Sequence, residues 1–188
     1  MGDVKLDRKK LELTDGKIIL RPYRMEYVDK AYQAINESRA EISVWLPFAQ
    51  EGYSIKDSRD WIKKRPQCWK KGIEYEFAIF DAEGDTIIGG CGLNGISKES
   101  RKANLGYWVR TSYTGRGVAA AATKLLARWG FEALKLKRIE IVVAVGNERS
   151  LRVVEKVGAK REGVLRNRIN IHEKMHDAVM YSLIPGEV

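Results

Sequence analysis

The segment between residues 102 and 145 constrains the fold most, because it places a helix between two strands. KANLGYWVR, residues 102–110, predicts one strand. RIEIVVAV, residues 138–145, predicts a second strand, so continuously apolar that both of its faces should be buried. Between them, apolar residues recur along one face of a helix: Val118, Ala122, Leu125, Trp129 and Ala133. Because such a crossover joins parallel strands, we expect an α/β fold with a parallel pair near Asn104 and Arg138.

Hydrophobic periodicity assigns most of the remaining chain. Amphipathic helices are expected at residues 25–38 and 57–70, and Pro66 should end or kink the second. A shorter helix is expected at residues 147–158, between a capping asparagine and a terminal glycine. Further strands are expected at residues 16–24, 74–80, 86–96, 159–170 and 176–184. These elements form a mixed, mostly antiparallel sheet with flanking helices.

Length, charge and cysteine content indicate one soluble domain. We expect it to span residues 10–188, after an N-terminal extension at residues 1–9. Cys68 and Cys91 are too few for a disulfide framework, and no apolar run directs secretion or spans a membrane, so a cytoplasmic location is expected. The net charge of +9 favours polyanionic partners: nucleic acid, an anionic cofactor or an acidic protein.

The stretch YTGRGVAAAATKLL, residues 113–126, places two glycines and an arginine directly before a run of four alanines. A helix N-terminus offers unpaired N–H groups and the positive end of a dipole, so the loop is suited to a phosphate. Its spacing excludes a P-loop. It matches the GxGxxA pattern of dinucleotide-binding folds, but the acidic residue that should end the next strand is missing. A tight turn without a ligand is the alternative that the spacing leaves open.

The loop and several other stretches together resemble the GCN5-related N-acetyltransferases (GNAT). These stretches are LRPYR, VWLPFA, IIGGCGLNGI, NLGYWVR, VAVGNERSLRVVEKVGAKREG and HDAVMYSLI, which cover nearly all of the chain. The likeness is closest to the branch of bacterial ribosomal-protein N-terminal acetyltransferases. It implies a GNAT fold whose parallel strand pair is splayed, with acetyl-CoA as co-substrate and a protein N-terminus as acceptor.

The resemblance assigns the acetyl-CoA contacts. The phosphates would lie on the loop, which consists of Thr114, Gly115, Arg116, Gly117, Val118 and Ala119. Thr114 departs from the glutamine or arginine of the family pattern, which affects that one contact. The pantetheine arm would pair with the backbone of Tyr107, Trp108 and Val109, whose side chains we expect to pack in the core. Asn147 would contact the same arm and also cap its helix.

The resemblance also places Ser150 where it would protonate the departing thiolate. Its spacing with Val153, Val154 and Val157 turns the hydroxyl toward the apolar side of the helix. A hydrogen bond from this serine back to the backbone is the alternative interpretation.

For the general base, many relatives have a glutamate where this chain has Asn104. Glu74 and Glu76 share one face of their strand, and Glu76 is the candidate base, a solvated position at the sheet edge being the alternative. An α-amine has a pKa of about 8, against about 10.4 for lysine, so an N-terminal acceptor needs little help to lose its proton.

The resemblance also places the acceptor groove near VWLPFA, where Trp45 and Phe48 would line it together with Asn94. Packing in the core is an equal alternative for Trp45. Cys91 has no histidine partner in the sequence, so we expect a packed side chain and direct transfer without an acetylated enzyme. The two histidines lack metal-ligand spacing, which predicts no metal.

The predicted function is therefore acetyl-CoA-dependent acetylation of a protein N-terminus, such as that of a ribosomal protein. Two alternatives remain open. One is acetylation of a small amine, such as a polyamine, an amino acid or an antibiotic. The other is a basic nucleic-acid-binding module, although no recognition signature for nucleic acid is present. Association with the ribosome or an acidic protein is a further expectation, and a homodimer is an option that the sequence leaves open.

Overall fold

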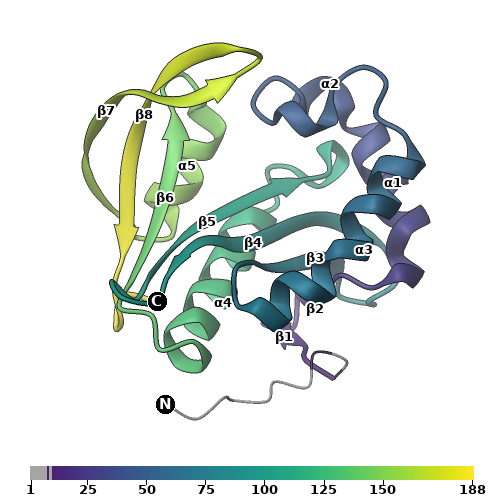
Figure 1. Ribbon diagram of the computed structural model, residues 1–188, viewed down its shortest axis with the longest axis horizontal. Coiled ribbons are helices and arrows are strands. Elements are labelled where there is room, and N and C mark those ends of the chain that lie inside the picture. The colour runs from purple at the N-terminus through teal and green to yellow at the C-terminus, as the bar shows by residue number, and fades with distance from the viewer. Residues whose placement is uncertain (1–7, 9) are drawn as a thin grey trace.

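The computed structural model describes residue 8 and residues 10–188, and it contains one sheet with helices on both faces (Figure 1). Apart from Arg8, the expected N-terminal extension lies outside the described residues. The strands are β1 (Leu13–Thr14), β2 (Ile18–Pro22), β3 (Tyr75–Asp81), β4 (Ile87–Ser97), β5 (Lys102–Val109), β6 (Arg138–Ala144), β7 (Lys160–Ile171) and β8 (Lys174–Leu183). The helices are α1 (Val28–Glu37), α2 (Arg39–Ile42), α3 (Ile55–Lys71), α4 (Val118–Ala133) and α5 (Glu148–Lys156). Short 3-10 turns occur at η1 (Met25–Tyr27), η2 (Pro47–Ala49) and η3 (Thr111–Tyr113).

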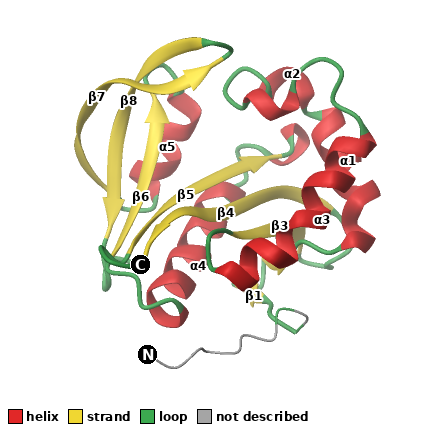
Figure 2. Cartoon of the chain, in the orientation of Figure 1, coloured by secondary structure: helices red, strands yellow, loops and turns green. Residues whose placement is uncertain are grey.

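The sheet has eight strands in the order β1-β2-β3-β4-β5-β6-β8-β7. All neighbouring pairs are antiparallel except β5 and β6, so the predicted mixed α/β architecture is confirmed. The helices α1 and α3 cover one face, and α4 crosses the other (Figure 2).

The parallel pair β5 and β6 is splayed. The two strands pair only through Lys102↔Arg138, Ala103↔Ile139 and Asn104↔Glu140, which confirms the predicted place of the parallel contact. Beyond Asn104 the strands diverge toward their C-terminal ends (Figure 1). The sheet therefore has an opening between its two halves.

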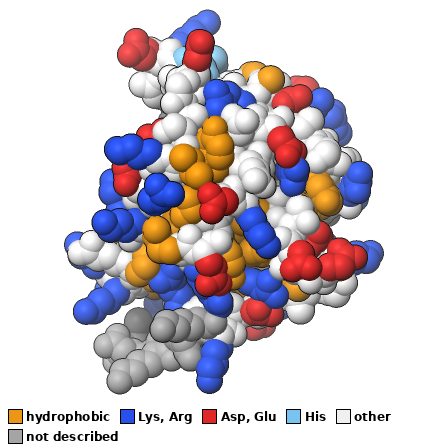
Figure 3. Space-filling view, turned by 90° about the vertical axis from the view of Figure 1, so that its right-hand side faces the viewer, with side chains coloured by type: hydrophobic (Ala, Val, Ile, Leu, Met, Phe, Trp, Pro, Cys, Tyr) orange, Lys and Arg blue, Asp and Glu red, His pale blue; other side chains and the backbone are white. Residues whose placement is uncertain are grey.

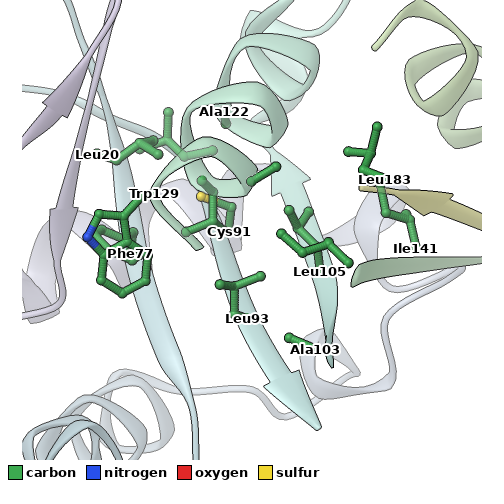
Figure 4. Close-up of a cluster of buried hydrophobic side chains, with 14 of the residues drawn as sticks. Leu20, Phe77, Cys91, Leu93, Ala103, Leu105, Ala122, Trp129, Ile141 and Leu183 are labelled. Atoms are coloured by element: carbon green, nitrogen blue, oxygen red, sulfur yellow. The ribbon is translucent and has the colours of Figure 1, made fainter. Parts of the chain in front are cut away.

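The larger core lies between the sheet and α4. Phe77, Cys91, Leu93 and Leu105 point from the strands toward α4, where they meet Ala122 and Trp129 (Figure 4). The buried stripe of α4 includes Leu126, whereas the predicted Leu125 is half-buried at its margin. A second cluster lies on the opposite face and joins η1, α1 and α3 to Ala78, Phe80 and Ile87.

The expectation that Pro66 ends α3 is wrong, whereas the expected span of this helix, residues 57–70, lies within the observed one. Helix α3 runs through Pro66 and ends only at Gly72, which takes the left-handed conformation that favours glycine (φ 67°). The proline removes one hydrogen bond, but Trp69 in the following turn packs against Phe77 and Trp129 and holds the end of the helix in place.

Strand β6 alternates between half-buried and buried residues instead of being buried on both faces. Its outer face carries Arg138 and Glu140, and Glu140 accepts hydrogen bonds from Arg138 (2.9 Å) and Lys102 (3.2 Å). Among the helices that the structure describes, none is long and apolar enough to cross a membrane.

Candidate active site

A cavity of about 690 Å³ lies on the face of the sheet that α1 and α3 cover. Its walls come from these two helices and from the segment around η2, and its floor comes from β3, β4 and β5. Phe48 and Asn94, both predicted to bind the acceptor, line it. Trp45 is not among the lining residues; its ring lies 3.8 Å from the position that a Cβ would take at Gly146, across the opening of the sheet. The prediction for Trp45 is therefore not supported by its position.

Glycines in β4 and β5 make the floor of this cavity. Glu76 is paired with Gly92, and Gly92 with Gly106, so one carboxylate and two bare positions share a row across three strands. A Cβ at Gly92 would collide with the Glu76 carboxylate. At Gly90, a Cβ would lie 2.6 Å from the Tyr23 hydroxyl oxygen and also collide with the indole of Trp108. Gly90 and Gly92 are thus needed for side chains that reach across the floor.

Glu76 is the ionisable group at the bottom of the cavity. Burial raises the pKa of Glu76 to about 7, while the Arg65 charge lowers this pKa and the Glu74 charge raises it. Arg65 is itself buried and ion-paired to Glu74, which limits how far it can stabilise an ionised Glu76. No hydrogen bond to the Glu76 carboxylate is made by any residue that the structure describes. The alternative of a solvated position at the sheet edge is therefore wrong for Glu76, which faces the cavity. Glu74 precedes the strand and pairs with Arg65 of α3.

On the other face of the sheet, a hydrogen bond crosses the opening. The Tyr107 hydroxyl lies 2.7 Å from Ser150 Oγ and 3.3 Å from the Ser150 carbonyl oxygen, linking β5 to α5. Burial raises the pKa of Tyr107 to about 12, so this hydroxyl keeps its proton at neutral pH. The Tyr107 ring packs against the larger core, as expected, and its hydroxyl in addition holds the candidate proton donor.

The start of α5 positions Ser150. Asn147 Oδ1 accepts a hydrogen bond from the Ser150 N–H (3.1 Å), so the predicted cap is confirmed. The helix ends before Gly158 (φ 85°), also as predicted. Ser150 is half-buried, with its hydroxyl bonded to Tyr107.

The free edge of β5 lines the opening. The N–H of Arg110 donates to Ile88 O (2.8 Å), so this residue faces β4. Backbone groups alternate between the two edges of a strand, and those of Tyr107 and Val109 therefore face β6, where the pairing has ended. The backbone of Trp108 faces β4, where it pairs with Gly90, so its expected pairing with the pantetheine arm is not supported; its side chain projects into the cavity on the acceptor face.

The glycine loop lies before α4, as predicted. Gly115 (φ 77°) and Gly117 (φ 82°) adopt left-handed conformations, and Gly117 is the residue that precedes the first turn of the helix. Arg116 stacks on Tyr113, and Lys156 Nζ of α5 lies 3.9 Å from the position that a Cβ would take at Gly117. The loop thus brings two cations close to the first N–H groups of α4, which begin at Val118 and Ala119. This combination suits a polyphosphate.

Other predicted features are placed as follows. Cys91 is buried among apolar side chains, and burial raises the pKa of its thiol well above the usual range (Figure 4). Cys68 and Cys91 are both free. Within the described residues, no group of three or more His, Cys, Asp or Glu side chains is arranged to hold a metal ion. The absence of a metal from the working enzyme stays a prediction.

Sequence reasoning missed three contributors to the site: Tyr23, Trp61 and Arg65. Tyr23 follows β2 and Trp61 belongs to α3, and both line the cavity far in sequence from its floor. Arg65 of α3 does not line the cavity but acts on the pKa of Glu76. The available signal was the run of glycines in β4, because glycine inside a strand indicates that another group approaches closely.

Comparisons with known proteins identify the family. The Acetyltransferase (GNAT) domain family matches residues 17–160. A Bacillus subtilis protein named "Putative ribosomal N-acetyltransferase YdaF" is 31% identical over 175 residues, covering 90% of this chain and 92% of the relative. The ribosomal-protein-serine acetyltransferase of Escherichia coli is 26% identical over 158 residues, covering 84% and 87%.

A solved structure of RimL, a ribosomal L7/L12 alpha-N-protein acetyltransferase in complex with coenzyme A, shares the fold. Its TM-score is 0.85 over 93% of this chain and 98% of that one, at 20% identity. The match to the family model over most of the chain, on a splayed sheet of this topology, shows that the protein belongs to the GNAT acetyltransferase family.

Proposed function

We propose that this acetyltransferase transfers an acetyl group from acetyl-CoA directly to the α-amine of a protein N-terminus. The observation that carries the proposal is the opening between β5 and β6. The Glu76 carboxylate lies in the cavity on one face of the sheet, and the Tyr107–Ser150 hydroxyl pair lies on the other. Acetylation of an amine needs one group that accepts a proton from the nitrogen and another that returns a proton to the thiolate. Glu76 and Ser150 fill these two roles.

In the proposed reaction, Glu76 takes a proton from the acceptor ammonium, directly or through water. The nitrogen lone pair forms a C–N bond to the thioester carbonyl carbon, and the C–S bond breaks as the tetrahedral intermediate collapses. Ser150 gives a proton to the departing thiolate. The nitrogen then loses its second proton, which restores the hydroxyl of Ser150. Backbone N–H groups of β5 that face the opening, at Tyr107 and Val109, are available to the carbonyl oxygen.

Direct transfer is favoured because the cysteine nearest to the cavity is a poor nucleophile. Cys91 is buried, and its raised thiol pKa keeps it protonated at neutral pH. The carbonyl therefore meets the acceptor amine itself.

The described residues around the glycine loop fit acetyl-CoA. Gly115 and Gly117 leave open space over the start of α4, and Arg116 and Lys156 supply positive charge beside it. Asn147 keeps its amide N–H₂ group as a donor for the pantetheine arm after its oxygen caps α5.

A protein N-terminus as acceptor is supported by the names of the relatives, which act on ribosomal proteins. It also agrees with a base whose pKa is about 7, because an α-amine is less basic than a lysine side chain. Ribosome association, a homodimer and a cytoplasmic location stay predictions.

The test uses purified protein, acetyl-CoA and synthetic peptides from ribosomal-protein N-termini, each with an internal lysine. Every peptide is paired with an identical one whose α-amine is formylated. Fragment-ion mass spectrometry should locate the acetyl group on the free α-amine and find none on the formylated partner. Acetylation of lysine in both members, or of neither, would contradict the proposal.

A further inference from the structure

The acceptor cavity is acidic although the chain is basic. Its charged lining residues are Glu51, Asp57 and Glu76, and no lysine, arginine or histidine lines it within the described part of the chain. We infer that the cavity selects N-termini followed by positively charged or neutral residues and rejects those followed by acidic residues. This inference rests on the proposed function and names the acceptor class of the same site.

The three carboxylates lie at different depths. Glu51 and Asp57 are exposed, so they lie at the rim of the cavity, whereas Glu76 lies on its floor. An α-ammonium that reaches Glu76 leaves the following residues of the acceptor near Glu51 and Asp57. Charge at those residues is therefore sensed by the rim.

Asp57 remains ionised at neutral pH. Its side chain belongs to a capping box at the start of α3, where Asp57 Oδ2 accepts hydrogen bonds from Ser54 Oγ (2.6 Å) and Ser54 N (2.9 Å). The hydrogen bond from the Ser54 hydroxyl is the main cause that lowers the pKa of Asp57. The same contacts hold the carboxylate at a fixed point of the rim.

The cations around the cavity are already engaged. Lys56, whose charge helps to lower the pKa of Asp57, is paired to Asp60 (3.1 Å). Arg65 is ion-paired to Glu74, and its guanidinium stacks 4.2 Å from the centre of the Trp61 ring. Arg39 donates to Asn36 Oδ1 (2.6 Å) and to the carbonyl oxygen of Tyr53 (2.9 Å). None of these cationic side chains is among those that line the cavity, so the rim carboxylates keep their negative field toward the acceptor.

The walls reinforce the preference for a cation. Aromatic side chains surround the cavity: Tyr23, Phe48, Tyr53, Trp61 and Trp108. The faces of aromatic rings attract cations, with tryptophan the most effective. Walls and rim therefore favour the same sign of charge.

The net charge of the whole protein predicts the opposite preference. At +9 the chain attracts acidic peptides at long range, and on the face seen in Figure 3 lysine and arginine side chains are interspersed with acidic ones. Local and global charge thus give opposite rankings of acceptors, and one experiment can separate them.

The experiment compares three peptides that begin with alanine and differ only at the second residue, which is lysine, glutamine or glutamate. Their α-amines have nearly the same basicity, so differences in kcat/KM report binding at the rim. We expect kcat/KM to fall by about two- to fivefold at each step from lysine to glutamine to glutamate, as for exposed charge pairs. The variant Glu51→Gln should narrow this range. Glu99→Gln, on the exposed turn between β4 and β5, should leave it unchanged.

A glutamate peptide that reacts as fast as the glutamine peptide would overturn the inference in favour of long-range attraction. If Glu51→Gln leaves the spread of kcat/KM among the three peptides unchanged, the inference is overturned as well, because the selectivity would then lie away from the rim. If none of the three peptides is acetylated, the proposed function itself fails. That result is distinct from acetylation without selectivity, which removes only the inference.

Discussion

The two faces of the sheet at its opening are built in different ways. On the acetyl-CoA face, the site consists of short consecutive segments: the loop at residues 114–119 and the first turn of α5 at Asn147 and Ser150. On the acceptor face, the cavity collects side chains from β2, α1, the η2 segment, α3, β3, β4 and β5. In the proposed mechanism, one face binds acetyl-CoA with backbone groups and helix starts, and the other binds the acceptor with side chains gathered from distant segments.

The two faces also differ in the free energy needed to present their functional groups. Helix N-terminal N–H groups lack intrahelical partners in any fold, so offering them to a phosphate costs little. Placing Glu76 in a desolvated cavity disfavours its charged form, and the raised pKa expresses that cost. The acceptor face therefore holds more of the reactivity and should be the more sensitive of the two to single substitutions.

The largest expected effect is that of Glu76→Gln, which removes the proposed base and keeps the shape of the side chain. We expect kcat/KM to fall by about 10²- to 10⁴-fold. In the parent, kcat/KM should rise as the pH increases through about 7, because Glu76 is protonated below its raised pKa. The variant should lose this limb of the pH profile, measured with a peptide acceptor under initial-rate conditions.

Glu74→Gln is the matched control for Glu76→Gln. It removes a carboxylate two residues away that pairs with Arg65 and does not line the cavity. This variant should keep most of the parental kcat/KM. The pH at which kcat/KM rises should move to a lower value, because a freed Arg65 better stabilises the ionised form of Glu76. A folded Glu76→Gln variant with parental rates would assign proton removal to another group or to solvent.

The raised pKa of Glu76 also predicts how the stability of the fold depends on pH. Between the ordinary value of 4.5 and about 7, the folded protein holds a proton on Glu76 that the unfolded chain has lost, so this residue destabilises the fold increasingly as the pH rises through that range. At pH 8, Glu76→Gln should therefore melt no lower than the parent. A much lower melting temperature would indicate that Glu76 has a structural role.

The second effect tests the acetyl-CoA face through Ser150→Ala. Because water can also protonate a thiolate, we expect a loss at the lower end for a general acid, about 10²-fold in kcat, with little change in KM for acetyl-CoA. Tyr107→Phe should give a smaller loss by freeing the Ser150 hydroxyl to rotate. The double variant should be no slower than Ser150→Ala, because Tyr107 acts through Ser150.

If Ser150→Ala retains more than about a third of the parental kcat while chemistry limits the rate, the serine is structural. Loss of one hydrogen bond should lower the free energy of unfolding by about 1 kcal/mol, which thermal unfolding would detect. A double variant that is slower than either single variant by the product of their effects would give Tyr107 an independent role.

The contrast between the faces also explains what the sequence predicts. The position of the glycine loop before α4, the Asn147 cap and the end of α5 at Gly158 each depend on residues close together in the chain, and each is confirmed. The parallel pair joins distant residues, but the single helical crossover between its two strands predicts it. Local periodicity and capping rules apply within single segments, where few alternatives compete.

The environment of Glu76 could not be predicted in this way. Its strand pattern leaves open whether residue 76 faces solvent or a cavity, because the answer depends on α1 and α3 packing over that end of the sheet. The same holds for Pro66, where Trp69 packs against α4 and outweighs one lost hydrogen bond. Contacts across more than ten residues set both outcomes, and propensity within a segment does not include them.

The smallest expected effect is that of Gly117→Val on acetyl-CoA binding, and it tests whether the loop binds through its backbone. The valine would stand over the first turn of α4, near Lys156, and hold the phosphates away from the N–H groups there. It also strains a backbone with φ 82°, so Gly16→Val, at φ 83° in an open turn of the β1–β2 hairpin, is the matched control for strain.

Both variants should lose similar stability. Only Gly117→Val should weaken acetyl-CoA binding in calorimetry, by roughly 10- to 100-fold if one or two charge-assisted hydrogen bonds are lost. Equal affinities in the two folded variants would show that the loop is a turn and that side chains alone hold the co-substrate, and the contrast between the two faces would disappear.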